Sequence, residues 1–371
     1  VFVNFFGTFD YAWVRRAAPK GLLLFDDGEA SVKMRNGRKA KMFRTAVQDA
    51  DQYIATGLFI RSSAEWFQQL ESQRRFEEEE RQRVVREKER YVNTYAPGLA
   101  YWGSTAPTPE VMTTLRSHLE DLAKHYQALA QQGAKVPQVN QAEVQTAFLA
   151  AAGWYRRILD IYPEDSKAPE INYLLAETLE DGGKPLDAAN EFTKTAYGYT
   201  MHARSLDAGY AAVLAYHKNA EAQPAAGRAP ALKQAVAASV KLADEFPTHP
   251  QAVTALTRAA QDLYELKDVQ SITVAQRVLS YTPPPTPEQR RIVQGVLGDS
   301  YFAQGDFPRA EVAYADLLKL TPVNDAARAQ VVEQLAASIY KQAEAARAEG
   351  NLRAAADGFL RVGRVTPEAA I

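Results

Sequence analysis

Histidines, cysteines and paired carboxylates most often carry catalysis or metal binding, and this chain holds few of them in useful patterns. Its histidines are His118, His125, His202, His217 and His249. Only His118 and His125, seven residues apart, share one face of a predicted helix. Two helical turns is a long separation for joint metal ligation, and the sequence HLEDLAKH is not the HExxH pattern of zinc enzymes. We therefore predict no metal site, and interpret His118 and His125 as helix-surface residues.

No other pattern predicts an enzyme. The chain has no cysteine, which excludes disulfides, thiolate metal sites and cysteine nucleophiles. It contains no phosphate-binding loop, no dinucleotide fingerprint and no nucleophile elbow. Its many carboxylates lie on predicted helices, where they are typical of solvated faces. The sequence predicts no catalytic residue, no cofactor and no enzymatic activity.

The composition of the chain limits the kinds of partner that it can attract. The 371 residues carry a formal net charge of -2, so the molecule as a whole has no electrostatic attraction for nucleic acid or membranes. No run of about eighteen apolar residues occurs, and we expect no membrane span. The first residues lack the basic flank and small-residue cleavage site of a secretory signal. Any attraction to nucleic acid must therefore be local.

The first sixty residues differ from the rest. Residues Val1–Phe6 and Tyr11–Val14 are rich in β-branched and aromatic types and are separated by a Gly-Thr pair, which predicts two strands joined by a tight turn. From about Lys41 to Ile54 the apolar spacing predicts a helix. The segment Asn4–Val14, reading NFFGTFDYAWV, resembles the third and fourth strands of a PWWP domain. The resemblance implies a partial β-barrel with a C-terminal helix over residues 1–60.

In the PWWP family an aromatic cage holds methylated lysine by attraction to ring faces, and Phe5 matches its position on the third strand. The other two cage aromatics lie on strands that this sequence does not contain, and the aromatics here are alternatively barrel core. Basic residues follow, which in that family contact DNA phosphates; a solvated loop is the alternative. These residues are Lys33, Arg35, Arg38, Lys39, Lys41 and Arg44.

A charged helix is expected next. Residues Trp66–Arg90 contain no Gly or Pro, and opposite charges lie four apart, as in Arg74 with Glu78. The sparse apolar positions do not hold a heptad repeat, which disfavours a coiled coil. We interpret residues 61–95 as a linker helix between modules, ending near the turn at Pro97-Gly98.

The remainder, residues 96–371, is predicted to be helical and repetitive. Small and aromatic residues in Leu297–Pro322 resemble the tetratricopeptide consensus in identity and spacing, and the offsets recur in Ala343–Pro367. Earlier and weaker copies extend the array to about residues 145–367. The predicted fold is mainly α, a tetratricopeptide-like α-solenoid preceded by the PWWP-like partial β-barrel and the charged helix. Gly298 and Ala343 are 45 residues apart, against about 34 in the family, which predicts extended helices.

The repeat resemblance implies a groove that binds a protein or peptide partner. Our leading hypothesis is a non-enzymatic interaction scaffold; the alternative is a chromatin reader that binds a methylated histone tail and DNA through the PWWP-like module. The repeats are similar to bacterial envelope-associated tetratricopeptide proteins, and this resemblance implies the cell envelope or periplasm. The PWWP resemblance implies the nucleus instead. The two together imply that the chain is a fusion or a chimera. Candidate groove residues, each alternatively an ordinary surface or packing residue, are Asn172, Glu177, Tyr210, Tyr216, Arg291 and Gln294.

Overall fold

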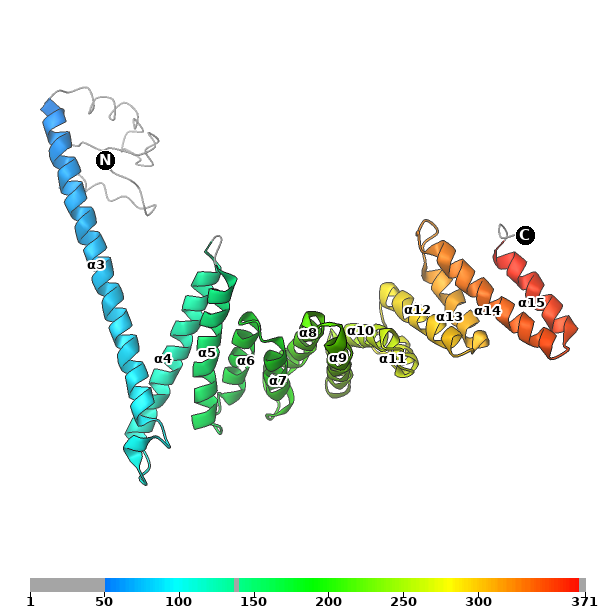
Figure 1. The fold of residues 1–371 in the computed structure, drawn as a ribbon, viewed down its shortest axis with the longest axis horizontal. Coiled ribbons are helices and arrows are strands. Elements are labelled where there is room, and N and C mark those ends of the chain that lie inside the picture. Colours follow the sequence, from blue (N-terminus) through cyan, green and yellow to red (C-terminus); the bar gives the residue numbers. More distant parts are fainter. Residues whose placement is uncertain (1–50, 137–139, 367–371) are drawn as a thin grey trace. The chain divides into compact units, whose positions relative to one another are not determined.

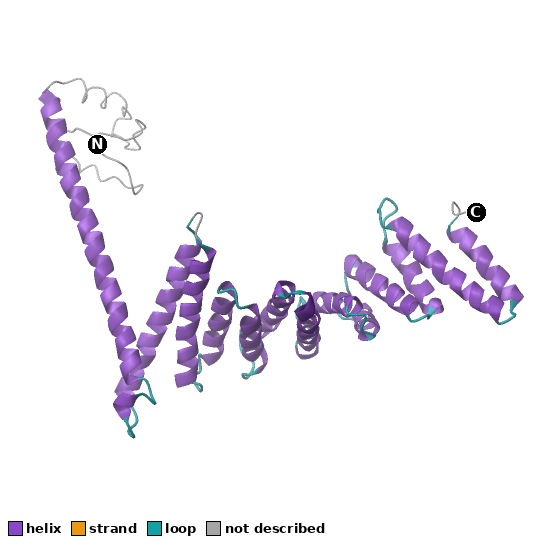
Figure 2. Ribbon diagram, viewed as in Figure 1, coloured by secondary structure: helices purple, strands orange, loops and turns teal. Residues whose placement is uncertain are grey.

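The computed structural model describes residues 51–136 and 140–366, with side chains described from residue 71 onward. Within these residues the secondary structure is helical and contains no strand, so the prediction of a mainly α protein is confirmed for this part (Figure 1, Figure 2). The PWWP-like barrel, its cage candidate Phe5 and the basic patch from Lys33 to Arg44 lie outside the described residues. They stay predictions.

One long helix, α3 (Asp51–Tyr95), covers the predicted charged segment. Its side chains pair along the helix surface, as in Arg75 with Glu71 at 3.8 Å and Arg83 with Glu80 at 2.7 Å. Such exposed pairs each stabilise a helix by only about 0.3–0.5 kcal/mol, so the length depends on many good helix formers as well. The helix passes without a break through the predicted boundary at residues 60 and 61. The chain divides into two compact units between Arg90 and Tyr91.

The second unit, Tyr91–Ile371, is a series of antiparallel helix pairs, in which each helix packs against the next and α10 also packs on α12. A short 3-10 helix, η1 (Ala100–Trp102), precedes the series. The first helices of the pairs are α4 (Pro109–Ala134), α6 (Ala168–Asp181), α8 (Ser205–Ala222), α10 (Ala252–Glu265), α12 (Pro287–Ala303) and α14 (Arg328–Ala348). The second helices are α5 (Gln141–Ile161), α7 (Pro185–Tyr197), α9 (Ala225–Glu245), α11 (Gln270–Leu279), α13 (Phe307–Leu320) and α15 (Leu352–Val365).

Small residues bring the two helices of a pair together, as the consensus predicts. A Cβ on Gly298 in α12 would lie 2.5 Å from the Tyr314 ring in α13, so the ring occupies the space that the glycine leaves. In the last pair, a Cβ on Gly358 would lie 2.7 Å from the Cβ of Ala343. Tyr314 is 2% exposed and belongs to a continuous core that extends from α9 to α14. Burial of such a side chain contributes about 1.5–3 kcal/mol.

The turn between the helices of a pair also repeats. Gly183, Gly305 and Gly350 have φ angles of 71°, 78° and 80°, the left-handed conformation that ends a helix and favours glycine. At the corresponding place after α10 the chain has Lys267, with φ 55°. These four pairs therefore share one turn geometry, and of the four only the degenerate unit lacks the glycine.

Helix lengths explain the irregular repeat. Helix α14 has 21 residues and α12 has 17, so the last repeat is lengthened mainly in its first helix. The Pro- and Gly-containing segment 224–230 is not a loop: Pro224 is the N-cap of α9, and the rest forms its first turns. Proline suits the N-cap because the first N–H groups have no partner within the helix, whereas Pro230 lies inside α9 and removes one hydrogen bond there.

Candidate functional site

The first helices lie side by side, joined by polar contacts between side chains roughly one repeat apart. We call the surface that carries these contacts the first-helix face. The contacts are Glu180 with Lys218 (3.1 Å), Glu221 with Arg258 (2.8 Å), Thr254 with Gln289 (3.0 Å) and Asp299 with Gln334 (3.0 Å). A surface of this kind holds its helices in register and presents their side chains together.

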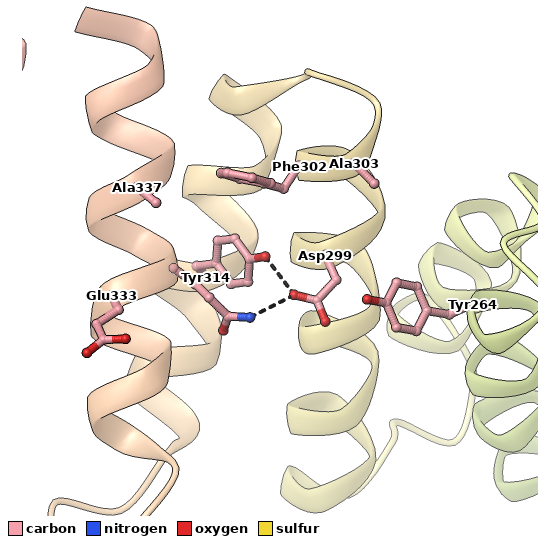
Figure 3. A pocket seen from close by; sticks show the side chains of 8 residues that line it. Tyr264, Asp299, Phe302, Ala303, Tyr314, Glu333 and Ala337 are labelled. Atoms are coloured by element: carbon pink, nitrogen blue, oxygen red, sulfur yellow. Dashed lines mark hydrogen bonds between the residues drawn. The ribbon is translucent and has the colours of Figure 1, made fainter.

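A cavity of about 460 Å³ opens on this face between α10, α12 and α14, and we call it the Asp299 pocket (Figure 3). Cavities of roughly 300–1,000 Å³ are typical of binding sites. Its walls combine aromatic rings, alanines and two carboxylates. The lining residues are Tyr264, Asp299, Phe302, Ala303, Tyr314, Glu333, Gln334 and Ala337.

Asp299 is held in place by two donors. Its Oδ1 accepts a hydrogen bond from the Tyr314 hydroxyl at 2.6 Å and another from Nε2 of Gln334 at 3.0 Å (Figure 3). Burial, together with the hydrogen bond to Asp299, raises the pKa of Tyr314, which therefore stays a donor. Burial and then the charge of Asp299 also raise the pKa of Tyr264, whose hydroxyl points toward the carboxylate. The carboxylate is thus oriented from three helices.

The negative charge of the pocket is not balanced by a nearby cation. Among the described residues, no lysine or arginine forms an ion pair with Asp299 or Glu333. Arg291, in the same helix as Asp299, instead bridges Glu288 and Asp325, both at 2.9 Å. Negative charge beside the rings of Tyr264 and Phe302 attracts a cation. The pocket contains no serine, cysteine or histidine that could act as a nucleophile or base.

Tyr264, Asp299 and Gln334 lie 35 residues apart in sequence, and therefore at equivalent positions of three successive first helices. None of the three is among the residues predicted from the sequence, because Asp299 lies between consensus positions of the repeat, where polar residues are common on a solvated helix face. They could have been identified as polar residues that recur at the repeat spacing, one on each of three successive first helices.

Two predicted groove residues lie in α6. Asn172 is fully buried and donates to the Glu191 carbonyl at 2.7 Å and to the Thr195 hydroxyl at 2.9 Å, so it joins α6 to α7. Glu177 is half-buried, and burial raises its pKa while Arg204 lowers it. Asn172 does not reach the first-helix face.

Tyr210 and Tyr216 point in different directions from α8. The Tyr210 ring lies 5.7 Å from the His249 ring, beside the turn before α10. Tyr216 donates to Oδ1 of Asn190 in α7 at 2.9 Å and lines a smaller cavity of about 210 Å³ between α7, α8 and α9. The structure does not bring the two tyrosines to one site.

Arg291 and Gln294 are both half-buried in α12. Arg291 connects its helix to the turn before α14 through Asp325, and Arg116 makes the same kind of connection to Asp165 at 2.7 Å. Neither Arg291 nor Gln294 lines the Asp299 pocket. A contact of either residue with a partner stays a prediction.

The described residues contain no group of three or more His, Asp or Glu side chains that could hold a metal ion. Within the same residues, every helix is too short or too polar to cross a membrane.

No protein-family model and no curated protein matches the chain. Solved structures that it resembles include a thermophilic TPR protein of Thermus thermophilus, with 20% identity, a TM-score of 0.29, and coverage of 57% of this chain and 98% of that one. PilF of Pseudomonas aeruginosa has 15% identity and a TM-score of 0.27, over 68% and 95% of the two chains. BtubC of P. vanneervenii has 18% identity and a TM-score of 0.24, over 77% and 91%. At these low scores, the helix-pair architecture rests on the helices described above.

Proposed function

We propose that the chain is a non-enzymatic scaffold that binds a protein partner on the first-helix face of a tetratricopeptide-like array. The single observation that carries this proposal is the Asp299 pocket, an open cavity built by three successive first helices. Stacked repeats characteristically present such extended surfaces for peptides and proteins. The pocket supplies a place for one anchoring side chain, and the neighbouring helices supply a track for the flanking chain.

The chemistry of the pocket supports binding rather than catalysis. Asp299 accepts two hydrogen bonds at Oδ1, from Tyr314 and Gln334, which fix the orientation of its carboxylate. A catalytic carboxylate would be expected beside a second group that exchanges protons with it near neutral pH. Tyr314, with its raised pKa, cannot take that role. The pocket is therefore suited to hold a charged group in place.

The experiment is a selection of random peptides displayed on phage against the full chain, followed by hydrogen exchange of the complex with a selected peptide. We expect protection on α10, α12 and α14. The variant Ala303→Trp, which fills the mouth of the pocket, should abolish binding. A matched control is Val312→Trp, because Val312 is 62% exposed on the second helix α13.

Two results would contradict the proposal. One is a selection that returns no peptide with specific affinity. The other is a peptide whose binding survives Ala303→Trp and whose protection lies on the second helices.

A further inference from the structure

We propose that the Asp299 pocket binds the side chain of a lysine carried by an extended segment of the partner protein. This inference rests on the proposed function and names the group that the pocket recognises. It starts from the charge of the site. Asp299 is half-buried, Glu333 lies at the rim, and no lysine or arginine of the described residues neutralises either of them.

The pocket differs in this respect from the surface around it. Elsewhere on the first helices, carboxylates of the contact series are paired within the chain, as Glu180 is with Lys218 and Glu221 with Arg258. Asp299 is the carboxylate of that series whose partners, Tyr314 and Gln334, are uncharged. A cation from outside would complete the series.

The hydrogen bonds of Asp299 favour an ammonium over a guanidinium. Oδ1 already accepts two bonds, which uses both of its lone pairs. Only Oδ2 has capacity left. The Tyr264 hydroxyl, which also hydrogen-bonds to Asp299, uses part of that capacity, so the carboxylate can accept one further donor. An arginine reaches its full strength with two parallel bonds to both oxygens of one carboxylate, and that geometry is blocked here. A lysine ammonium acts as a point charge and needs only one oxygen, and the exposed Glu333 adds negative charge at the rim of the pocket.

The apolar lining fits the rest of a lysine. Phe302, Ala303 and Ala337 provide surface for the four-carbon stem, and Tyr264 points its hydroxyl toward Asp299 from the opposite wall (Figure 3). Long cationic side chains commonly bury their stem on apolar groups while the charged end finds polar partners. Aromatic rings add attraction for the ammonium. Acetylation of such a lysine would remove the charge that the pocket recognises.

The test uses fluorescein-labelled peptides of alternating glycine and lysine, with matched peptides that carry arginine or acetyl-lysine. Fluorescence anisotropy with the full chain is measured at physiological ionic strength, where long-range attraction between exposed charges is screened. We expect the lysine peptide to bind about tenfold more tightly than the arginine peptide, and the acetyl-lysine peptide not to bind.

Two variants probe the carboxylates. Asp299→Asn should weaken binding of the lysine peptide by about tenfold, and Glu333→Gln by about threefold. The matched control is Glu349→Gln, which removes the same charge from an exposed position at the end of α14 and should leave affinity unchanged. Because Glu333 is exposed on the surface of α14, its variant should fold normally and carries the test if Asp299→Asn is poorly folded.

The inference is overturned if the arginine peptide binds as well as the lysine peptide, or if Glu333→Gln and Glu349→Gln weaken binding equally. Those results leave the scaffold proposal standing, provided that phage-selected peptides still compete for the first-helix face. Failure of the phage selection itself would instead count against the scaffold.

Discussion

At two places an aspartate lies between successive first helices, and the hydrogen-bond partners of the two aspartates differ. Between α12 and α14, Asp299 accepts from Tyr314 and Gln334 and opens into a pocket. Between α8 and α10, Asp262 faces His217 with Oδ2 and Nδ1 3.6 Å apart, which is too far for a hydrogen bond. The Oδ2 atom and both ring nitrogens are buried without a hydrogen-bond partner.

The electrostatic consequence follows from burial. His217 and Asp262 are 3% and 7% exposed. Burial lowers the pKa of His217 to about 4, helped by Arg258, and raises the pKa of Asp262 to about 6 against the opposing effect of Arg258. The pair lies within ion-pair distance, yet burial favours the neutral form of each. Asp262 therefore destabilises the fold when it is ionised, because it is buried and its Oδ2 has no donor. Asp299 differs in that two side chains donate to its Oδ1.

The largest effect is expected for Asp262→Asn. An acid with a raised pKa destabilises the folded state once it is ionised, so wild-type stability is lost as pH rises from the ordinary value of 3.8 through about 6. Removing the charge should raise the free energy of unfolding at pH 8 by on the order of 3 kcal/mol, and by nothing below about pH 4. Urea unfolding, with hydrogen exchange on α8 and α10 as the local reporter, measures this. Asp299→Asn should instead lower the free energy of unfolding at pH 8. An increase for this variant would contradict the difference proposed between the two aspartates.

The variant His217→Gln tests the other member of the pair. A histidine with a lowered pKa is neutral in the fold, so wild-type stability falls as pH drops from 6.5 toward 4, where the unfolded chain takes up the proton first. In the variant this loss is absent. Its stability relative to wild type should therefore rise by about 2 kcal/mol between pH 7.5 and pH 4.5. The opposite slope, or none, in the same urea series would show that the imidazole is not held neutral.

Tyr314→Phe removes one donor from Asp299 and keeps the ring against Gly298. We expect a loss of about 1.5 kcal/mol at neutral pH, because Asp299 loses a hydrogen bond from Tyr314 and keeps those from Gln334 and Tyr264. Thermal unfolding followed by circular dichroism measures the change. The control is Tyr340→Phe, since Tyr340 is exposed on α14 and lies outside the pocket. Equal effects of the two changes would mean that the Tyr314 hydroxyl does not support Asp299.

The smallest effect is expected for Gln334→Leu. This change removes the second donor at a half-buried position, where water replaces part of the lost contact, and should cost about 0.5–1 kcal/mol. Combined with Tyr314→Phe in a double-mutant cycle, it should show coupling, because both donors act on one oxygen. Strictly additive losses would argue that the two donors stabilise Asp299 independently.

The repeat consensus predicted the part of the fold that depends on local spacing. The glycine at 298, the ring at 314 and the proline after α13 are short-range features, and they indicated the helix pair and its close approach from the sequence alone. The turn glycines at 305 and 350 did the same for the connections. These positions are informative because only one residue type suits a close contact or a positive φ.

The contacts between repeats were not predictable in the same way. His217 and Asp262 are separated by the whole of α9, and nothing in the sequence around either residue indicates that they face one another. Asn172 is a predicted groove residue because it is polar and lies on a first helix. Polarity alone does not distinguish a side chain that hydrogen-bonds to the neighbouring helix α7 from one that contacts a partner protein. Sites between repeats depend on how each helix is shifted and rotated relative to its neighbours. The sequence of a weak and irregular repeat does not specify that placement well.

The equal spacing of Tyr264, Asp299 and Gln334 has a consequence for how such a protein can change. A segment of 35 residues that begins anywhere from Tyr264 to Asp299 contains one residue of this series. Its duplication would therefore copy a recognition element and its supporting helices in one genetic step, and its loss would delete both together. A duplicated Asp299 repeat would place two carboxylates one repeat apart on the first-helix face, an arrangement suited to partners that carry two positive charges at that spacing.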